Sequence, residues 1–336
     1  MVLITGGTGL VGSHLLYKLA QQGEPLRATY RTEQRKAMVE EVFSYYTDDP
    51  KALFDRIEWV ACDITDPVTL ASHFEGVAKV YHCAALISFD PKDDKRLHKI
   101  NVGGTKNVVN LCIAHGIEKL CYVSSIAAIG PAVGEAWVTE ETEWQDLPNT
   151  GYSHSKYRSE MEVWRASQEG VDVVIVNPGV IIGPGFFKSG SGLFFHSVAR
   201  GQKFVLPNGT GFVTVMDTVL AMQLLMGSDL KNERYVLVNE NLSYLELVTQ
   251  IASAMNLEPP KKVLKSWQLE LLWRLDWLKS VLGGKRRRLS KRTARLFAKR
   301  DYYDHSKIKA LEGFSFEPLS AVIAKTAAIY RDHYPE

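Results

Sequence analysis

Short apolar and β-branched runs recur along the first half of the chain, separated by segments whose apolar residues return three and four positions apart. The runs are typical of strands that are covered on both faces, and the wider spacing is typical of helices. The predicted strands are 2–5, 26–30, 57–61, 79–83, 119–124 and 173–177, and the predicted helices are 10–22, 34–46, 67–75, 93–115 and 152–169.

The first predicted strand runs directly into a glycine-rich turn. Gly6 permits a tight turn, Gly9 lets backbone N–H groups approach a pyrophosphate, and Gly12 lets the next helix pack close to the sheet. The N-terminus of that helix would then face the anion with its partial positive charge. A turn without a ligand is the alternative. The pattern favours a bound dinucleotide, held by Gly6, Thr8, Gly9, Leu10 and Val11.

The alternation of strands and helices predicts an α/β fold with a doubly wound parallel sheet of the Rossmann type. We expect residues 1–178 to form the dinucleotide-binding domain, joined by later elements at about 205–240. After Pro178 the chain becomes rich in glycine and serine, which is typical of loops. Residues 179–204 and 241–336 are therefore predicted to form a smaller C-terminal lobe that binds the substrate.

Basic residues follow the second predicted strand, where an Asp or Glu usually binds the ribose 2′-hydroxyl of NAD. Arg31 stands there, with Arg35 and Lys36 close behind. A guanidinium favours a 2′-phosphate through paired, charge-assisted hydrogen bonds, so the sequence favours NADP over NAD. Glu33 would suit NAD if a loop shift brought it to the ribose. A solvated helix face is the alternative reading, and it applies more to Arg35 than to Arg31.

The third predicted strand is followed by an aspartate that could contact the adenine base. Asp63, next to Ile64, can accept a hydrogen bond from the adenine amino group at this place in such a sheet. The alternative is that Asp63 begins the next helix, a role that Asp66 can also take. We predict that Asp63 and Ile64 contact the cofactor.

Tyr152 and Lys156 stand four residues apart in a predicted helix, so their side chains share one face. A free phenol has a pKa of about 10, which is too high for an efficient base near neutrality. A nearby ammonium stabilises the phenolate, so that Tyr152 can exchange a proton with a substrate oxygen while hydride moves to or from a nicotinamide. Ser124 and Ser125 lie at a strand C-terminus, where a serine can hydrogen-bond the same oxygen.

Together these motifs resemble the extended short-chain dehydrogenases/reductases, of the NAD(P)-dependent epimerase, dehydratase and dihydroflavonol-reductase-like type. The resemblance implies that Ser125, five residues before Gly130, is the catalytic hydroxyl. It also implies that Tyr152 is the acid/base and Lys156 its electrostatic partner. The resemblance covers most of the chain and rests on Thr5–Gly12, Asp63-Ile64, His82–Ala85, Asn101–Thr105, Ser124-Ser125, Tyr152 with Lys156, Asn177–Gly179 and Tyr303–Lys307.

The resemblance implies further positions around the cofactor and the substrate. Ala84 and Ala85 would line the cofactor channel, and Pro178 and Gly179 would shape the nicotinamide pocket. Asn101 would be a structural and relay position, although by itself it is a polar residue at a helix start. The family also implies a homodimer formed by the helices near 93–115 and 152–169. Apolar residues after Ala85 suggest an apolar substrate pocket, and core packing is the alternative for the aromatic residues. The residues predicted to contact the substrate are Leu86, Phe89, Gly179 and Phe186.

The residues around Ser125 select among the reactions of such enzymes. Ile126–Ala128 carry no proton, which disfavours a dehydratase, and Arg31 disfavours an epimerase that retains NAD. We predict an NADP-dependent oxidoreductase that reduces a carbonyl, or oxidises an alcohol, of a small apolar or cyclic substrate. The alternatives are a sugar-nucleotide epimerase or reductase, and a catalytically silent NADP-binding regulator, which would not need the intact catalytic residues.

Composition narrows the remaining classes of function. A net charge of +2 is too small to indicate nucleic-acid binding, and no uncharged apolar stretch is long enough to span a bilayer. We expect no signal peptide, because Met1 already stands at the edge of the first strand. The cysteines form no C-x-x-C pair and lie in or beside apolar stretches, which predicts reduced thiols, a cytoplasmic protein and no metal site: Cys62, Cys83, Cys112 and Cys121.

The segment 257–318 is predicted to be helical and strongly basic. Residues 261–300 interleave Lys and Arg with Leu and with Trp267, Trp273 and Trp277, and include the run Lys285–Arg288. The favoured interpretation is a solvated face of the lobe whose apolar side packs inward. Contact with an anionic membrane surface comes second, and binding of a phosphorylated substrate or nucleic acid is a third option.

Overall fold

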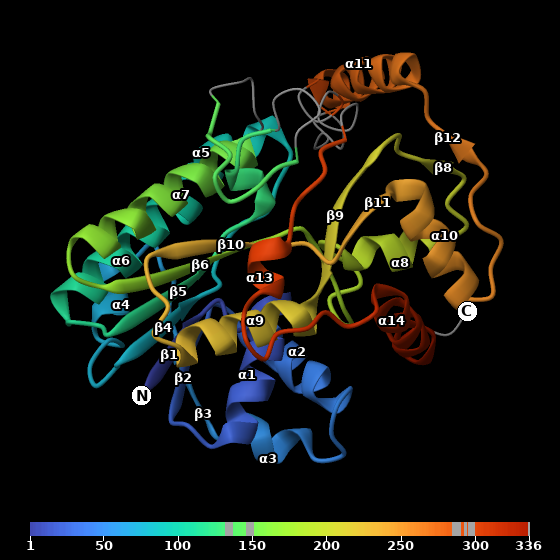
Figure 1. Ribbon diagram of the computed structural model, residues 1–336. Coiled ribbons are helices and arrows are strands. Elements are labelled where there is room, and N and C mark those ends of the chain that lie inside the picture. The colour runs from blue at the N-terminus through green and yellow to red at the C-terminus, as the bar shows by residue number, and fades with distance from the viewer. Residues whose placement is uncertain (132–136, 146–150, 284–289, 292–293, 295–299, 335–336) are drawn as a thin grey trace.

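The computed structural model of the chain describes residues 1–131, 137–145, 151–283, 290–291, 294 and 300–334 (Figure 1). Its centre is a seven-stranded sheet in the order β10-β6-β5-β4-β1-β2-β3, with every neighbouring pair parallel. The predicted Rossmann-type α/β fold is therefore confirmed, and all six predicted strands are present with ends that shift by at most one residue. The seven strands are β1 (Val2–Thr5), β2 (Leu26–Tyr30), β3 (Ile57–Ala61), β4 (Lys79–His82), β5 (Lys119–Val123), β6 (Asp172–Pro178) and β10 (Glu233–Leu237).

Helices cover both faces of the central sheet (Figure 1). Along β5, Cys121 packs into the core on one face, and Leu120 and Tyr122 pack into the core on the other. This alternation is the period of two that a strand buried on both faces requires. On the first face lie α1 (Leu10–Gln22), α2 (Glu33–Ser44), α3 (Pro50–Phe54) and α9 (Val215–Gly227), and on the second lie α4 (Pro67–Ala71), α6 (Gly104–Ala114) and α7 (Gly151–Gln168).

The single helix predicted over 93–115 is divided into segments of different winding. They are the 3₁₀ turn η1 (Pro91–Asp93), α5 (Asp94–Leu97), the π-helix η2 (His98–Gly103) and α6. Gly104 follows the π-helix at a point where a Cβ would overlap the side chain of Ile64. Apolar spacing does not reveal such a change, because a π-helix adds one residue to a turn at sites that tertiary contacts select.

The C-terminal part adds a second core beside the first. It contains a three-stranded sheet in the order β11-β9-β7 and a two-stranded pair, β12-β8. Ile308 and Phe314 fall in the predicted lobe but pack into the core around α1 and α9. The predicted domain boundaries stay a prediction. The elements are β7 (Val180–Ile182), α8 (Gly192–Ala199), β8 (Phe204–Val205), β9 (Gly209–Thr214), β11 (Glu240–Ser243), α10 (Tyr244–Ala254), β12 (Lys262–Val263), α11 (Ser266–Gly283), α13 (Ser306–Lys309) and α14 (Leu319–His333).

Candidate active site

In the glycine loop after β1, two of the three key glycines have no room for a side chain. Gly6 has a φ of +73°, and a Cβ there would collide with the backbone of Ala84. A Cβ on Gly12 would overlap the Gly6 carbonyl oxygen, whereas one on Gly9 would meet only that oxygen at 3.5 Å. From its N-cap at Gly9, α1 has neither a capping side chain nor an acidic first turn, so its N–H groups fit a pyrophosphate. The neighbouring residues predicted to contact the cofactor are half-buried: Thr8, Leu10 and Val11.

The basic residues after β2 differ in how they are held. Glu33 accepts a hydrogen bond from the Tyr30 hydroxyl at 2.5 Å and pairs with Lys36 at 3.4 Å. The Lys36 ammonium also lies 5.0 Å from the centroid of the Tyr30 ring. Arg31 is exposed, and its side chain makes no hydrogen bond or ion pair with the described part of the chain. Arg31 is therefore available to an anionic ligand, whereas Glu33 and Lys36 already have partners.

The loop after β3 separates the two aspartates by role. Asp66 caps α4 by accepting hydrogen bonds from the N–H groups of Val68 and Thr69. Asp63 is exposed and accepts one from Thr65 N at 2.9 Å. The capping role thus belongs to Asp66, and the predicted contact of Asp63 with adenine stays a prediction. The other residues predicted to line this side are the buried Ile64, the half-buried Ala84 and the exposed Ala85.

Ser125 and Tyr152 meet at the carboxyl end of β5. The Ser125 hydroxyl accepts a hydrogen bond from Ala127 N at 3.1 Å. Burial raises the pKa of Tyr152 to about 12, and the Ser125 hydroxyl beside the phenol acts in the opposite direction. The Phe89 ring lies edge-on to Tyr152 with 5.6 Å between centroids. The phenol therefore carries its proton near neutral pH and can act as an acid.

Lys156 lies one turn after Tyr152 on α7, and its hydrogen bonds reach across to β5. Its ammonium donates to the Tyr122 hydroxyl and to the Val123 carbonyl, both at 2.8 Å. Burial lowers the pKa of Lys156 to about 7, whereas the charge of Glu160 raises it. Its predicted role as electrostatic partner of Tyr152 stays a prediction, since the hydrogen bonds seen here do not join the two side chains.

Asn101, in the π-helix, ties the loop that follows β4 to α7. Its amide donates to Leu86 O at 3.0 Å and to Ser155 Oγ at 2.9 Å, and its carbonyl accepts from Leu86 N at 2.7 Å. These bonds hold the loop that carries Phe89 against the helix that carries Tyr152. Asn101 therefore has a structural role here, and the relay role that the family resemblance implies stays a prediction.

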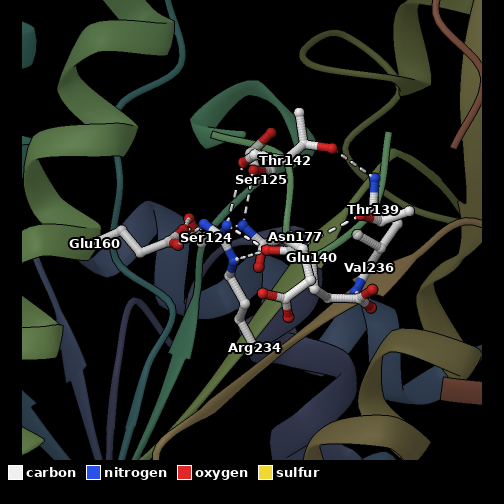
Figure 2. Close-up of polar contacts among 10 residues, drawn as sticks. Ser124, Ser125, Thr139, Glu140, Thr142, Glu160, Asn177, Arg234 and Val236 are labelled. Atoms are coloured by element: carbon white, nitrogen blue, oxygen red, sulfur yellow. Dashed lines mark hydrogen bonds and ion pairs between the residues drawn. The ribbon is translucent and has the colours of Figure 1, made fainter. Parts of the chain in front are cut away.

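A buried polar network lies behind Ser125 (Figure 2). Glu160 on α7 accepts from Ser124 Oγ at 2.5 Å and from Asn177 Nδ2 at 2.9 Å, and it pairs with Arg234 at 3.0 Å. Asn177 Nδ2 also donates to the Ser125 carbonyl at 3.1 Å. The network joins α7 to the ends of β5 and β6 and to β10, and so fixes the backbone of Ser125, the predicted catalytic hydroxyl.

Sequence reasoning missed the charged members of this network. Glu160 had a local signal, because it follows Lys156 by four residues and therefore shares its helix face. Arg234 and Glu140 had none, because they come from distant segments. The Arg234 guanidinium donates to the Glu140 carbonyl, and the Glu140 carboxylate accepts from Val236 N at 2.7 Å.

Glu160→Gln should destabilise the fold by about 3 kcal/mol, because it leaves the half-buried Arg234 charge without the carboxylate of the buried Glu160. Glu169→Gln is the matched control, since it breaks an exposed pair with Arg165 of 2.7 Å and should cost less than about 0.5 kcal/mol. Urea denaturation of both variants measures the difference. Equal losses would contradict the role given to the buried pair.

The residues predicted to contact the substrate do not all lie beside Tyr152. Phe186, with a φ of 54°, has its ring 6.0 Å from the Arg35 guanidinium carbon, on the side of α2. A Cβ on Gly179 would overlap the carbonyl of Gly211, so this glycine lets the end of β6 approach β9. Pro178 is buried and pairs with Leu237 of β10. Of this set, Phe89 contacts the Tyr152 ring.

Three other properties bear on the class of protein. Within the described residues, no group of His, Cys, Asp or Glu is arranged to hold a metal ion. Nor does any helix among them combine the length and apolarity needed to cross a membrane. All four cysteines are free, and three of them are buried.

The chain is similar to known proteins over ranges that include the candidate site. The family model "NAD dependent epimerase/dehydratase family" matches residues 2–237, a range that includes the glycine loop and Tyr152. The chain is 28% identical over 340 residues to the "Putative dihydroflavonol 4-reductase" of Synechocystis sp., covering 98% of this chain and 94% of that one. It is 30% identical over 260 residues to "Sterol demethylase protein B" of Methylococcus capsulatus, covering 74% of each. The solved structure "Crystal structure of gox2253" matches with a TM-score of 0.81 and 26% identity, over 99% of this chain and 98% of that one.

Proposed function

The chain belongs to the NAD dependent epimerase/dehydratase family, and on that premise we propose that it uses NADP to reduce a carbonyl, or oxidise an alcohol, of a small apolar or cyclic substrate. It is an NAD(P)-dependent oxidoreductase of the extended short-chain dehydrogenase/reductase type. The observation that carries the proposal is the placement of the Ser125 hydroxyl beside the buried Tyr152 phenol at the carboxyl end of β5. This is the edge of a doubly wound sheet where ligands bind.

The chain's own residues can perform the proton transfer that accompanies reduction. The cofactor, when bound, supplies the hydride. Tyr152 is protonated at neutral pH and donates its proton to the carbonyl oxygen as negative charge develops there. The Ser125 hydroxyl orients the same oxygen by a second hydrogen bond. Asn177 and Ala127 hold Ser125 in place through its carbonyl and its hydroxyl.

The cofactor would be held along the glycine loop and the strand ends beside it. The N-terminus of α1 would bind the pyrophosphate, and Arg31 the 2′-phosphate of the adenosine ribose. Lys156 would hold the nicotinamide ribose hydroxyls. Its buried position one turn after Tyr152 supports this role. Asp63, Ile64, Ala84 and Ala85 would border the adenosine and the channel.

Substrate screening with both cofactors tests the proposal. Aldehydes, cyclic ketones and sugar nucleotides are each mixed with NADPH or NADH and followed by nicotinamide absorbance. Dihydroflavonols and steroid ketones are the first cyclic probes, because the names of two relatives point to such compounds. We expect oxidation of NADPH with an apolar or cyclic ketone. Conversion of a sugar nucleotide without net change in absorbance would instead support the epimerase alternative and reject this proposal.

Arg31→Ala should raise the KM for NADPH by about 10- to 100-fold, because it removes charge-assisted hydrogen bonds to the 2′-phosphate. The KM for NADH should change by less than about twofold, since that cofactor has no phosphate there. Arg35→Ala is the control, because its guanidinium lies against Phe186 instead. Steady-state kinetics with both cofactors give the ratio, and an unchanged ratio would withdraw the preference for NADP.

Two further expectations belong to this proposal. We propose a homodimer formed through α6 and α7, as the family resemblance implies. A cytoplasmic location is proposed because all four cysteines are free. Light scattering tests the first, and a monomer mass over the working concentration range would reject it.

A further inference from the structure

Helix α11 presents an apolar face to solvent. Its residues are spaced four, four, three and four positions apart, so they lie along one side of the helix. Trp267 is 63% exposed and Leu282 is 78% exposed, and the other three residues of this face are each 45% to 50% exposed. The face consists of Trp267, Leu271, Leu275, Leu278 and Leu282.

The opposite side of α11 is the one that contacts the protein. Leu269 and Ser280 are buried, and Ser280 Oγ accepts a hydrogen bond from Lys92 Nζ at 3.1 Å. The expectation that the apolar side of this segment packs inward is therefore wrong for α11. The apolar residues do share one side of the helix, but the contact is made by the narrower side that carries Leu269 and Ser280. Figure 1 shows α11 at the margin of the molecule, outside the helices that cover the main sheet.

Basic residues flank the apolar face at both ends. Lys261, Lys262 and Lys265 are exposed immediately before the helix, and of these Lys261 is paired with Glu258 at 3.2 Å. The sequence after it contains Lys285–Arg288, further Lys and Arg up to Arg300, and no acidic residue; most of this stretch lies outside the described residues. Within the helix, Arg274 is paired with Glu270 at 2.7 Å. An apolar face that follows exposed lysines, and that a basic run follows in the sequence, complements an anionic surface that has an apolar interior.

The same helix adjoins the loop that borders the candidate active site. Lys92, which binds Ser280, lies in η1, directly after the loop that carries Ile87 and Phe89. Both of those apolar side chains are exposed, and the Phe89 ring contacts Tyr152. Helix α11 is thus tied, through the side opposite its apolar face, to the segment that follows the loop beside Tyr152.

We propose that α11 docks on an anionic membrane surface, with its apolar face at the boundary between headgroups and acyl chains and the lysines that precede the helix among the headgroups. The helix lies on the bilayer and does not cross it, in keeping with its length and its charges. A second copy of the chain is a poorer occupant. Antiparallel pairing of two α11 helices would bring the lysines before one helix toward the C-terminal end of the other, which Lys285–Arg288 follow in the sequence.

Vesicle co-sedimentation of the full chain tests this inference, and it needs no turnover, so its failure is distinguishable from failure of the proposed reaction. We expect pelleting with phosphatidylcholine vesicles that contain phosphatidylglycerol at low salt. Pelleting should be much weaker with phosphatidylcholine alone or at high salt. Tryptophan emission should shift to the blue on binding, because Trp267 and Trp277 are exposed in the free protein.

The double variant Leu275→Glu and Leu278→Glu should reduce the bound fraction at least about tenfold, because it places two charges in the docking face. Val68→Glu is the matched control, since Val68 on α4 is 81% exposed and lies outside that face; it should bind like the unchanged chain. Circular dichroism melts check that both variants fold.

Two outcomes would overturn the inference. One is equal pelleting of the double variant and the unchanged chain, or no pelleting of either at low salt. The other is a concentration-dependent dimer that the double variant abolishes while vesicles bind neither protein, which would assign the face to a second copy.

Discussion

Tyr152→Phe should lower kcat by about 10³-fold while the affinity for the cofactor changes by less than about twofold. The variant keeps the aromatic ring and its edge contact with Phe89, and it removes the hydroxyl that lies beside Ser125. Proton transfer to the substrate oxygen is then lost, but no contact that positions the glycine loop is disturbed. Absorbance kinetics measure kcat, and quenching of protein fluorescence by NADPH measures cofactor affinity.

Tyr157→Phe on the same helix separates the chemical effect from a general one. The Tyr157 ring stacks on Trp144 at 4.3 Å, and this contact survives removal of the hydroxyl. Its kcat should stay within about twofold of the unchanged enzyme. Full activity in Tyr152→Phe would refute the acid/base role, and a joint loss of activity and cofactor binding would assign Tyr152 to structure instead.

Lys156→Met should abolish turnover and yet raise the free energy of unfolding at neutral pH by about 2 kcal/mol. The lysine is buried, and burial disfavours its charged form. Methionine fills a similar volume without that penalty, although the Tyr122 hydroxyl and the Val123 carbonyl each lose a donor. Urea denaturation gives the free energies, and the absorbance assay gives the activity.

The pH dependence of that gain follows from the shift in the pKa of Lys156 from 10.5 to about 7. Between these values the unfolded chain binds more protons than the folded one, so the stability of the unchanged protein rises with pH. The advantage of the Met variant should therefore be largest at and below pH 7 and should shrink toward pH 10.5. Lys231→Met, at an exposed lysine paired with Asp172, should show no such trend. A variant that is less stable at every pH would mean that the two hydrogen bonds outweigh the burial penalty.

Much of the candidate site depends on local signals, and these are the parts that could be predicted. Gly6 adopts a positive φ, which glycine readily allows, and its turn lies between a short strand and the start of a helix. These three signals fall within a few neighbouring residues, so the candidate phosphate loop could be predicted from the local sequence. Tyr152 and Lys156 share a face because of the helix period. Ser125 stands at the end of a buried strand, and the parallel sheet brings that end toward α7.

The parts that could not be predicted involve groups that meet only in the folded chain. Glu160 pairs with Arg234, 74 residues away, because β10 adds to the sheet beside β6. The π-helix at His98–Gly103 turns Asn101 toward Leu86, although the apolar spacing is that of an ordinary helix. Burial and exposure are likewise properties of the assembled elements.

The amino-acid sequence alone predicted the main strands and helices of the first half of the chain, the candidate phosphate loop and the shared helix face of Tyr152 and Lys156, because each follows from the period and stereochemistry of neighbouring residues. The tertiary structure decided which acceptors hold the Lys156 ammonium, which distant charge balances Glu160, and which side of α11 faces water. These three depend on which surfaces meet and exclude solvent, and desolvation and pairing act between segments that are far apart along the chain.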